Sequence, residues 1–208
     1  ERRWLPSPNA LDFMKATHYI IQYQKVLNQQ SLRLEAFYKK YKGLVKTGVV
    51  GFTEAAISNN GFGDAKGVEL FWRDKKTIKN FDYWFSYSFL DTKRDFLNFP
   101  FAIAPNFAAK HTASIVAKKF VQNWKMNLNA AYNFASGRPY YNIRLDGNDY
   151  KFTDRGTIPS YHNLSFAINY LPFIGKEKPK SFAVYVFQVS NILNFKQTYG
   201  YQYSYNGY

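Results

Sequence analysis

The sequence predicts an all-β protein, and more specifically a segment of a transmembrane antiparallel β-barrel. Apolar and polar residues alternate with a period of two along most of the 208 residues, which is typical of strands with one wet and one apolar face. The predicted strands are mostly about 10–14 residues long, whereas strands of soluble proteins usually have about 5–6 and a membrane-crossing strand needs about 9–11. Short and long connections also alternate, as they do in outer-membrane barrels.

The clearest alternation covers residues 81–89. One face of this strand carries only aromatic rings, which are Phe81, Tyr83, Phe85, Tyr87 and Phe89. The other face carries Asp82, Trp84, Ser86 and Ser88. The same pattern, in places weaker, predicts seven further strands at about residues 15–26, 32–39, 64–74, 108–120, 124–134, 163–170 and 181–193.

The apolar faces of these strands are expected to meet lipid, and the polar faces to line a lumen. Aromatic residues gather near the strand ends on the apolar side, as in the girdles of membrane barrels, and the opposite faces are rich in Asn, Ser, Lys and Glu. A soluble sandwich would bury its apolar faces, but strand length and girdle placement favour the barrel. Three charged residues fall on lumen faces, where we expect ion pairs within the barrel: Glu35, Glu69 and Arg73.

The connections should place short turns at one end of the barrel and long loops at the other. Short ones are expected at residues 28–30, 74–80, 120–123 and 172–181, and long ones at 43–63, 91–107 and 138–159, with another from Asn194. Three short connections carry basic clusters, namely Lys75, Lys76 and Lys79; Lys118 and Lys119; and Lys176, Lys178 and Lys180. These are either solvated turn charges or contacts to anionic headgroups at the membrane rim.

Composition excludes several classes of protein. With 46% hydrophobic residues the chain can pack a core, so disorder is not expected, and without Cys it cannot hold disulfides or Cys-ligated metals. A net charge of +14 with 20% aromatic residues would also fit nucleic-acid binding. The Lys clusters lie at turns rather than on one continuous face, so we expect no nucleic-acid partner.

Four stretches in order carry a resemblance to a known family. The first stretch comprises residues 15–24 and 32–41, and the second is the Gly-rich segment 61–70, which leads into a strand with a Gly-x-Glu core. The third comprises residues 84–88, 110–112 and 132–140, and the fourth is Val189-Ser-Asn-Ile-Leu-Asn194. Together they resemble the C-terminal part of the barrel of TonB-dependent outer-membrane receptors, particularly those of the Bacteroidetes.

The resemblance implies a 22-strand barrel around an N-terminal plug, located in the outer membrane of a Gram-negative cell. Residues 1–208 would supply about eight strands of it, with the plug and the terminal strand absent from this chain. It implies TonB-dependent uptake of a scarce solute, which could be a siderophore or metal complex, a peptide or a glycan; starch-type glycan receptors fit less well. The implied partners are the TonB complex through the plug, outer-membrane lipid and lipopolysaccharide, and a surface lipoprotein.

An alternative is a stand-alone small outer-membrane barrel with a structural or adhesive role. It predicts that the eight strands close, with the first pairing the eighth, around a core of lumen side chains. The expected lumen faces carry mainly Asn, Ser, Ala and charged residues, which suits a wide interior better.

Ligand binding is expected at the barrel mouth, in the loops. Ser136-Gly-Arg-Pro-Tyr-Tyr141 ends a strand, so Arg138 could face an anionic substrate or a neighbouring loop, with Tyr140 and Tyr141 beside it. Residues 199–208 alternate Tyr with small polar residues, and their rings could stack a glycan or aromatic ligand, or form a girdle. The candidate ligand-binding residues are Arg138, Tyr140, Tyr141, Tyr201 and Tyr203.

We expect no enzymatic activity, no cofactor and no metal centre. The three His residues show neither metal-ligand spacing nor a catalytic context. Oxygen atoms of Asp146, Asn148, Asp149 and Asp154 could approach a calcium ion, but their spacing does not fit the twelve-residue calcium loop, so a plain acidic turn is the favoured interpretation.

Overall fold

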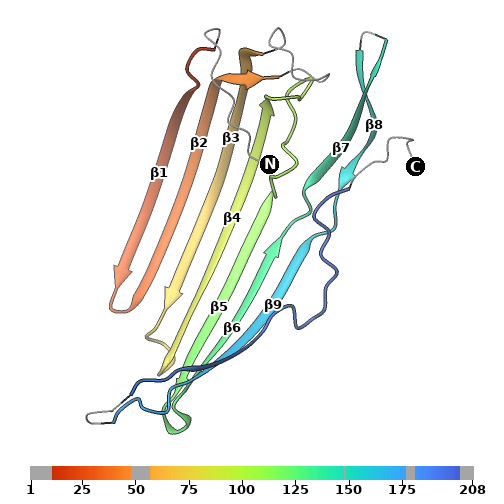
Figure 1. Ribbon diagram of the computed structural model, residues 1–208. Coiled ribbons are helices and arrows are strands. Elements are labelled where there is room, and N and C mark those ends of the chain that lie inside the picture. The colour runs from red at the N-terminus through yellow and green to blue at the C-terminus, as the bar shows by residue number, and fades with distance from the viewer. Residues whose placement is uncertain (1–10, 48–56, 148, 177–180, 202–208) are drawn as a thin grey trace.

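A computed structural model describes residues 11–47, 57–147, 149–176 and 181–201 (Figure 1). Ten strands and one short 3-10 turn follow one another as β1 (Lys15–Leu27), β2 (Gln30–Lys46), β3 (Ser58–Asp74), β4 (Phe81–Asp95), β5 (His111–Val121), η2 (Gln122–Trp124), β6 (Met126–Ala135), β7 (Pro139–Asp146), β8 (Asp149–Thr157), β9 (Tyr161–Tyr170) and β10 (Tyr185–Val189). Within these described ranges, no helix is long and apolar enough to cross a membrane.

Eight of the strands form one antiparallel sheet in the order β1-β2-β3-β4-β5-β6-β9-β10. Figure 1 shows it as a curved wall of steeply inclined strands, with β7 and β8 rising as a separate hairpin beyond one end. The all-β prediction is confirmed. The described sheet is open, with β1 and β10 at opposite edges, so it does not show the closure that a stand-alone eight-stranded barrel requires.

The register gives this wall one apolar and one polar face. Partners aligned across the strands place Leu34, Leu70, Tyr87, Ala113, Phe134 and His162 in one row. Other members of this apolar face are largely exposed in the chain: Tyr19 by 63%, Ile21 by 74% and Phe187 by 62%. Apolar side chains this exposed are typical of a surface that meets lipid.

The polar face carries the residues that alternate with these along each strand. Its neighbouring row runs through Gln22, Glu35, Glu69, Ser88, Thr112, Ala135 and Tyr161. Hydrogen bonds join neighbours on this face, as when the Ser114 hydroxyl donates to the Asn133 side-chain oxygen at 2.9 Å. An amide- and hydroxyl-rich face of this kind suits a wet lumen.

Small residues on the polar face of β3 leave room for large side chains of the neighbouring strands. Ala65 is only 3% exposed, and a Cβ built on Gly67 would lie 2.6 Å from Phe37 Cζ. Further up the same face, the Arg94 guanidinium stacks over the Tyr41 ring at 4.6 Å. The Gly-rich stretch of β3 therefore serves packing within the wall.

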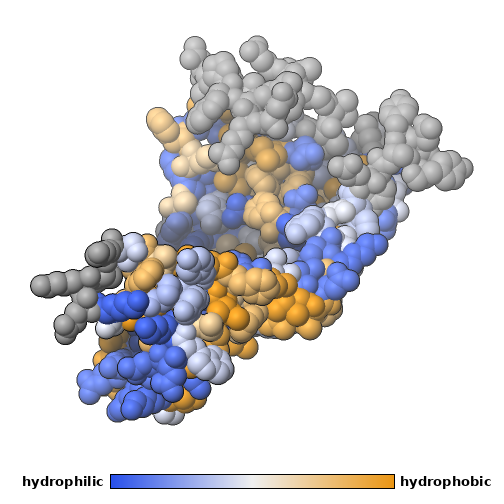
Figure 2. Space-filling view, turned by 60° about the horizontal axis from the view of Figure 1, so that its bottom comes forward, coloured by the Kyte–Doolittle hydropathy of each residue, from blue (hydrophilic) through white to orange (hydrophobic). Residues whose placement is uncertain are grey.

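The connections follow the predicted alternation, with the short turns at one end of the sheet and the long loops at the other (Figure 1). Gln29, Asn80 and Lys125 adopt the left-handed conformation that tight turns need. Figure 2, in which the short-turn end comes forward, shows hydrophilic residues gathered near that end beside a hydrophobic zone.

The structure corrects several boundaries. β2 continues to Lys46, β3 starts at Ser58 and β4 continues to Asp95, so the connections predicted at 43–63 and 91–107 are shorter. β10 pairs only with β9 and has five residues, so it is shorter than the strand predicted at about 181–193. The loop predicted at 138–159 is mostly the β7–β8 hairpin. Its tip contains Gly147 at a φ of 63°, the kind of residue that hairpin turns require.

Candidate binding site formed by the long connections

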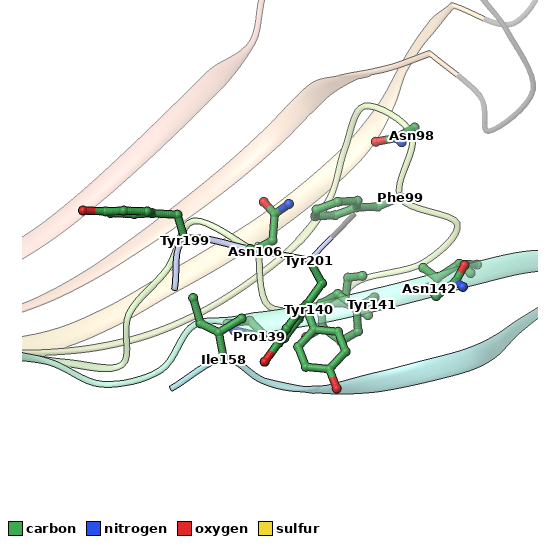
Figure 3. Close-up of a pocket in the computed structure, with 13 residues that line it drawn as sticks. Asn98, Phe99, Asn106, Pro139, Tyr140, Tyr141, Asn142, Ile158, Tyr199 and Tyr201 are labelled. Atoms are coloured by element: carbon green, nitrogen blue, oxygen red, sulfur yellow. The ribbon is translucent and has the colours of Figure 1, made fainter. Parts of the chain in front are cut away.

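Three segments that are distant in sequence enclose a cavity of about 380 Å³ at the long-loop end of the wall (Figure 3). They are the connection between β4 and β5, the β7–β8 hairpin, and the segment that follows β10. The lining residues are Asn98, Phe99, Ile103, Asn106, Pro139, Tyr140, Tyr141, Asn142, Ile143, Ile158, Tyr199, Gly200 and Tyr201.

The connection after β4 is held to the wall by main-chain hydrogen bonds. Arg94 and Ile103 exchange N–H···O bonds of 2.9 and 3.1 Å, and the Leu97 amide donates to the Val45 carbonyl at 2.7 Å. Ile103 and Pro105, which belong to this connection, are buried. The cavity floor on this side is therefore fixed by the backbone as well as by side chains.

The base of the hairpin is fixed by close backbone packing. The Ile158 amide donates to the Arg138 carbonyl at 3.0 Å, and a Cβ at Gly137 would run into the Ile158 carbonyl. On the hairpin itself, a Cβ at Gly156 would lie 2.8 Å from the Tyr140 phenol oxygen. Glycine at these two positions is what lets Pro139 and Tyr140 reach the cavity.

The C-terminal segment is anchored by Asn191 and by Arg138. The Asn191 side chain accepts from the Phe195 amide and donates to the Phe195 carbonyl, both at 3.1 Å, which closes a turn just after β10. Arg138 Nη2 donates to the Tyr199 carbonyl at 2.7 Å, and the Tyr140 and Tyr201 rings meet edge to face at 4.8 Å. These contacts bring the Tyr-rich tail onto the hairpin.

The structure brings together four of the five candidate residues that the sequence suggested. Tyr140, Tyr141 and Tyr201 line the cavity, and Arg138 lies beside it with its guanidinium bonded to a neighbouring segment rather than aimed at a ligand. Tyr203 lies outside the described residues. The sequence-based reasoning missed Asn98, Phe99 and Asn106, since nothing in residues 91–107 signals that this connection folds toward the hairpin.

The lining is polar without being charged. It carries amide groups from Asn98, Asn106 and Asn142, phenol groups from the tyrosines, and no acidic or basic side chain. Burial raises the pKa of the Tyr141 phenol, against an opposing effect of the Arg155 charge, so this phenol stays neutral at physiological pH. Amides and neutral phenols donate and accept hydrogen bonds, a chemistry that suits an uncharged polar ligand.

The hairpin tip does not gather a metal site in the described part of the chain. The Asp146 carboxylate accepts from Lys151 Nζ at 2.7 Å, and no group of three or more acidic or His side chains converges among the described residues. Asn148 lies outside the described residues.

At the other end of the wall, the lumen face carries an ion pair. Arg73 Nε and Nη2 donate to the two Asp82 carboxylate oxygens at 2.8 and 2.6 Å, which confirms the predicted pairing of Arg73. Lys75 Nζ lies 3.8 Å from the same carboxylate. Glu35 and Glu69 stand directly opposite each other in the register, and the ion pairs expected for them, to the wall or to a plug, stay a prediction.

The fold is similar to that of two solved outer-membrane proteins. The outer membrane transporter YddB from Escherichia coli aligns with a TM-score of 0.71 and 11% identity, covering 95% of this chain and 31% of YddB. The ferric yersiniabactin uptake receptor FyuA from Yersinia pestis aligns with a TM-score of 0.56 and 15% identity, covering 85% of this chain and 29% of FyuA. The chain has the fold of an outer-membrane transporter barrel wall.

The chain spans less than a third of each of these two proteins. Identities this low establish the fold and leave the cargo open. Comparison with protein-family models and with curated proteins finds no match.

Proposed function

We propose that the chain is the C-terminal barrel wall of a TonB-dependent receptor in a Gram-negative outer membrane, of the type found in Bacteroidetes. The observation that carries the proposal is an open sheet whose exposed face is apolar and whose opposite face is polar. Unpaired strand edges are not tolerated within lipid, so further strands must continue the sheet on both sides. Likeness to two solved outer-membrane proteins supports a closed barrel, which we propose has the 22 strands that the family resemblance implies.

In the proposed mechanism, the wall performs no bond-making chemistry. Extracellular loops capture a scarce solute, and TonB pulls on a plug held inside the barrel to open a path along the lumen. The polar face described above would form part of that path, and a surface lipoprotein would assist capture from outside.

We further propose that the loop cavity is one of the capture surfaces, with Tyr140, Tyr141 and Tyr201 in contact with the cargo. Aromatic rings offer an apolar face with a polar rim, which suits sugar rings and peptide side chains alike. Among siderophore or metal complex, peptide and glycan, the uncharged lining favours a cargo that presents neutral groups to this wall.

The intact mass of the native protein, extracted from outer membranes with detergent, tests this proposal. A receptor with a plug and a full barrel would have a mass several-fold above 24.3 kDa and would bind TonB in detergent. A native mass near 24.3 kDa would overturn the proposal, because the chain could then contain neither plug nor full barrel.

A further inference from the structure

Arg94 lies in a box of aromatic rings on the polar face of the wall, at its long-loop end. Its guanidinium carbon lies 4.6 Å from the ring centre of Tyr41, 5.7 Å from that of Phe107 and 6.0 Å from that of Phe96. We call these four side chains the Arg94 box. Ring faces attract a cation but are poor hydrogen-bond acceptors, so they position the guanidinium and leave its N–H donors open to another partner.

The backbone prepares the space for this arginine. Gly63 stands between Tyr41 and Arg94 in the register of β2, β3 and β4, and a Cβ built on it would lie 2.9 Å from Arg94 Cγ. The arginine side chain can therefore cross β3 to reach the Tyr41 ring. In addition, Arg94 and Ile103 exchange main-chain hydrogen bonds, which fasten the β4–β5 connection to the edge of the box. The Arg94 box is thus a built feature of the fold.

The guanidinium of Arg94 has no hydrogen-bond acceptor among the residues that the structure describes. Its Nε is buried and unbonded, and no described carboxylate lies within ion-pair distance of it. Arg73, on the same face near the short turns, shows the contrast, because it donates to both oxygens of Asp82. A buried donor without an acceptor costs free energy, so Arg94 favours a partner that brings one.

The face around the Arg94 box carries further basic groups. Lys39 stands on β2 two residues from Tyr41, and the His18 ring meets the Tyr41 ring edge to face at 6.4 Å. Both share the polar face with Arg94, because side chains alternate between the two faces along each aligned strand. The carboxylates on this face of the described main sheet all lie nearer the short turns; they are Glu35, Glu69 and Asp82. An anion that enters from the long-loop end therefore meets Arg94 and Lys39 before any of these carboxylates.

We propose that the Arg94 box binds a carboxylate of the cargo. Both carboxylate oxygens accept from the edge of the guanidinium, and the adjoining part of the molecule packs against the Phe107 ring, which is 54% exposed. A bidentate pair between arginine and carboxylate is among the strong hydrogen-bonded contacts of proteins, and it supplies the acceptors that Arg94 lacks.

The Arg94 box adjoins the loop cavity, which favours a carboxylate of the cargo over one of a plug. Ile103, the main-chain partner of Arg94, lines that cavity, and so does Asn106, the neighbour of Phe107. Together the two sites suit an organic molecule with one carboxylate and otherwise uncharged polar groups, as the C-terminal end of a short peptide has. The inference rests on the proposed function and names the chemical class of its cargo.

The test measures binding of N-acetylphenylalanine and of its amide to the intact protein in detergent, by isothermal titration. The two probes share the ring and differ only in carrying a carboxylate or an amide. We expect the acid to bind about tenfold more tightly than the amide, because only the acid can form the charged bidentate pair. Arg94→Gln should remove this preference and leave binding of the amide unchanged. The matched control, Arg144→Gln, removes an exposed arginine of the β7–β8 hairpin and should keep the preference.

Two further variants cover the case in which the glutamine disturbs the connection. Arg94→Lys keeps the positive charge and a long stem but lacks the planar fork, so it should retain a reduced preference for the acid. Phe107→Leu leaves the charge in place and removes one ring. It should therefore weaken binding of both probes by a similar factor and keep the ratio of their affinities.

Several results would overturn the inference. One is that the wild type binds the acid no more tightly than the amide, or binds neither, as expected if a plug carboxylate already occupies the Arg94 box. Others are an unchanged preference in Arg94→Gln and a lost preference in Arg144→Gln. Failure of the receptor proposal itself would look different, because it would appear as a native mass near 24.3 kDa and not in the ratio of two affinities.

Discussion

Single side chains close the turns of this wall, and Asp74 is the clearest case. It ends β3 at the short-turn end and is 2% exposed. Its carboxylate accepts from the Lys76 and Thr77 amides at 2.7 and 3.0 Å, from the Thr77 hydroxyl at 2.6 Å and from Gln30 Nε2 at 2.9 Å. These donors, with the Thr77 hydroxyl foremost, hold the pKa of this turn carboxyl well below its ordinary value.

We therefore expect Asp74→Ala to lower the urea midpoint of the intact protein in lipid vesicles at pH 7. A group with a depressed pKa contributes stability above its unfolded value of 3.8, and that contribution is lost as the pH falls through the lower folded value. The difference between wild type and Asp74→Ala should therefore be full at pH 7 and shrink below about pH 4. A difference that grows toward acid pH would contradict the role given to the ionised carboxylate.

Gly67 provides a second test at one position. A Cβ there would lie 2.6 Å from Phe37 Cζ and would also contact the Phe89 carbonyl. Gly67→Ala should cost about 1–3 kcal/mol in the free energy of unfolding, as overpacking does elsewhere. Gly200 has open space around it and serves as the control, so Gly200→Ala should leave stability unchanged. Equal effects of the two substitutions would show that the close fit of Gly67 against the Phe89 carbonyl and the Phe37 ring does not matter.

The elements of the wall differ in how far the sequence could predict them. The eight strands of the main sheet are predictable because the alternation of apolar and polar residues is local. It can be recognised within the sequence of each strand, without knowing which strand pairs with it. The β7–β8 hairpin was missed because Gly137, Pro139 and Gly147 all favour a loop, although Gly147 is also what a hairpin tip needs. The cavity could be predicted only in part, since Asn98 and Phe99 reach it through contacts with segments far away in sequence.

The hairpin and the tail should act together in binding. Tyr140 touches Tyr201 and lines the cavity, whereas Tyr185 lies on the lipid-facing side and is 63% exposed. If the proposed function holds, equilibrium binding of a panel of neutral oligosaccharides, peptides and ferric siderophores to the intact protein tests this, and Tyr140→Ala should weaken any bound member about tenfold or more. Tyr185→Ala should bind that member like the wild type. A ligand that binds equally well to both variants would place binding elsewhere on the protein.

The molecule as a whole is one curved wall whose two faces carry opposite chemistry. The strand register places the rings on the lipid-facing side and the amides, hydroxyls and ion pairs on the lumen side. A shift of one residue in the pairing of a strand would therefore move its apolar side chains to the lumen side. Both edges of the described sheet stop at strands that pair on one side only, and the proposed barrel would close through further strands.

Neighbouring positions on β4 test this arrangement directly. Phe85 stands in the row with Trp72 and Ile115, and Ser86 stands in the row with Phe71 and Ser114. The chain contains no Cys, so once any Cys outside these residues is replaced, Phe85→Cys and Ser86→Cys can each carry a single spin label in the intact protein in bilayers. The label at residue 85 should collide preferentially with oxygen, which concentrates in hydrocarbon, and the label at residue 86 preferentially with a water-soluble nickel chelate. The reverse order of accessibilities would contradict a wall whose apolar face meets lipid.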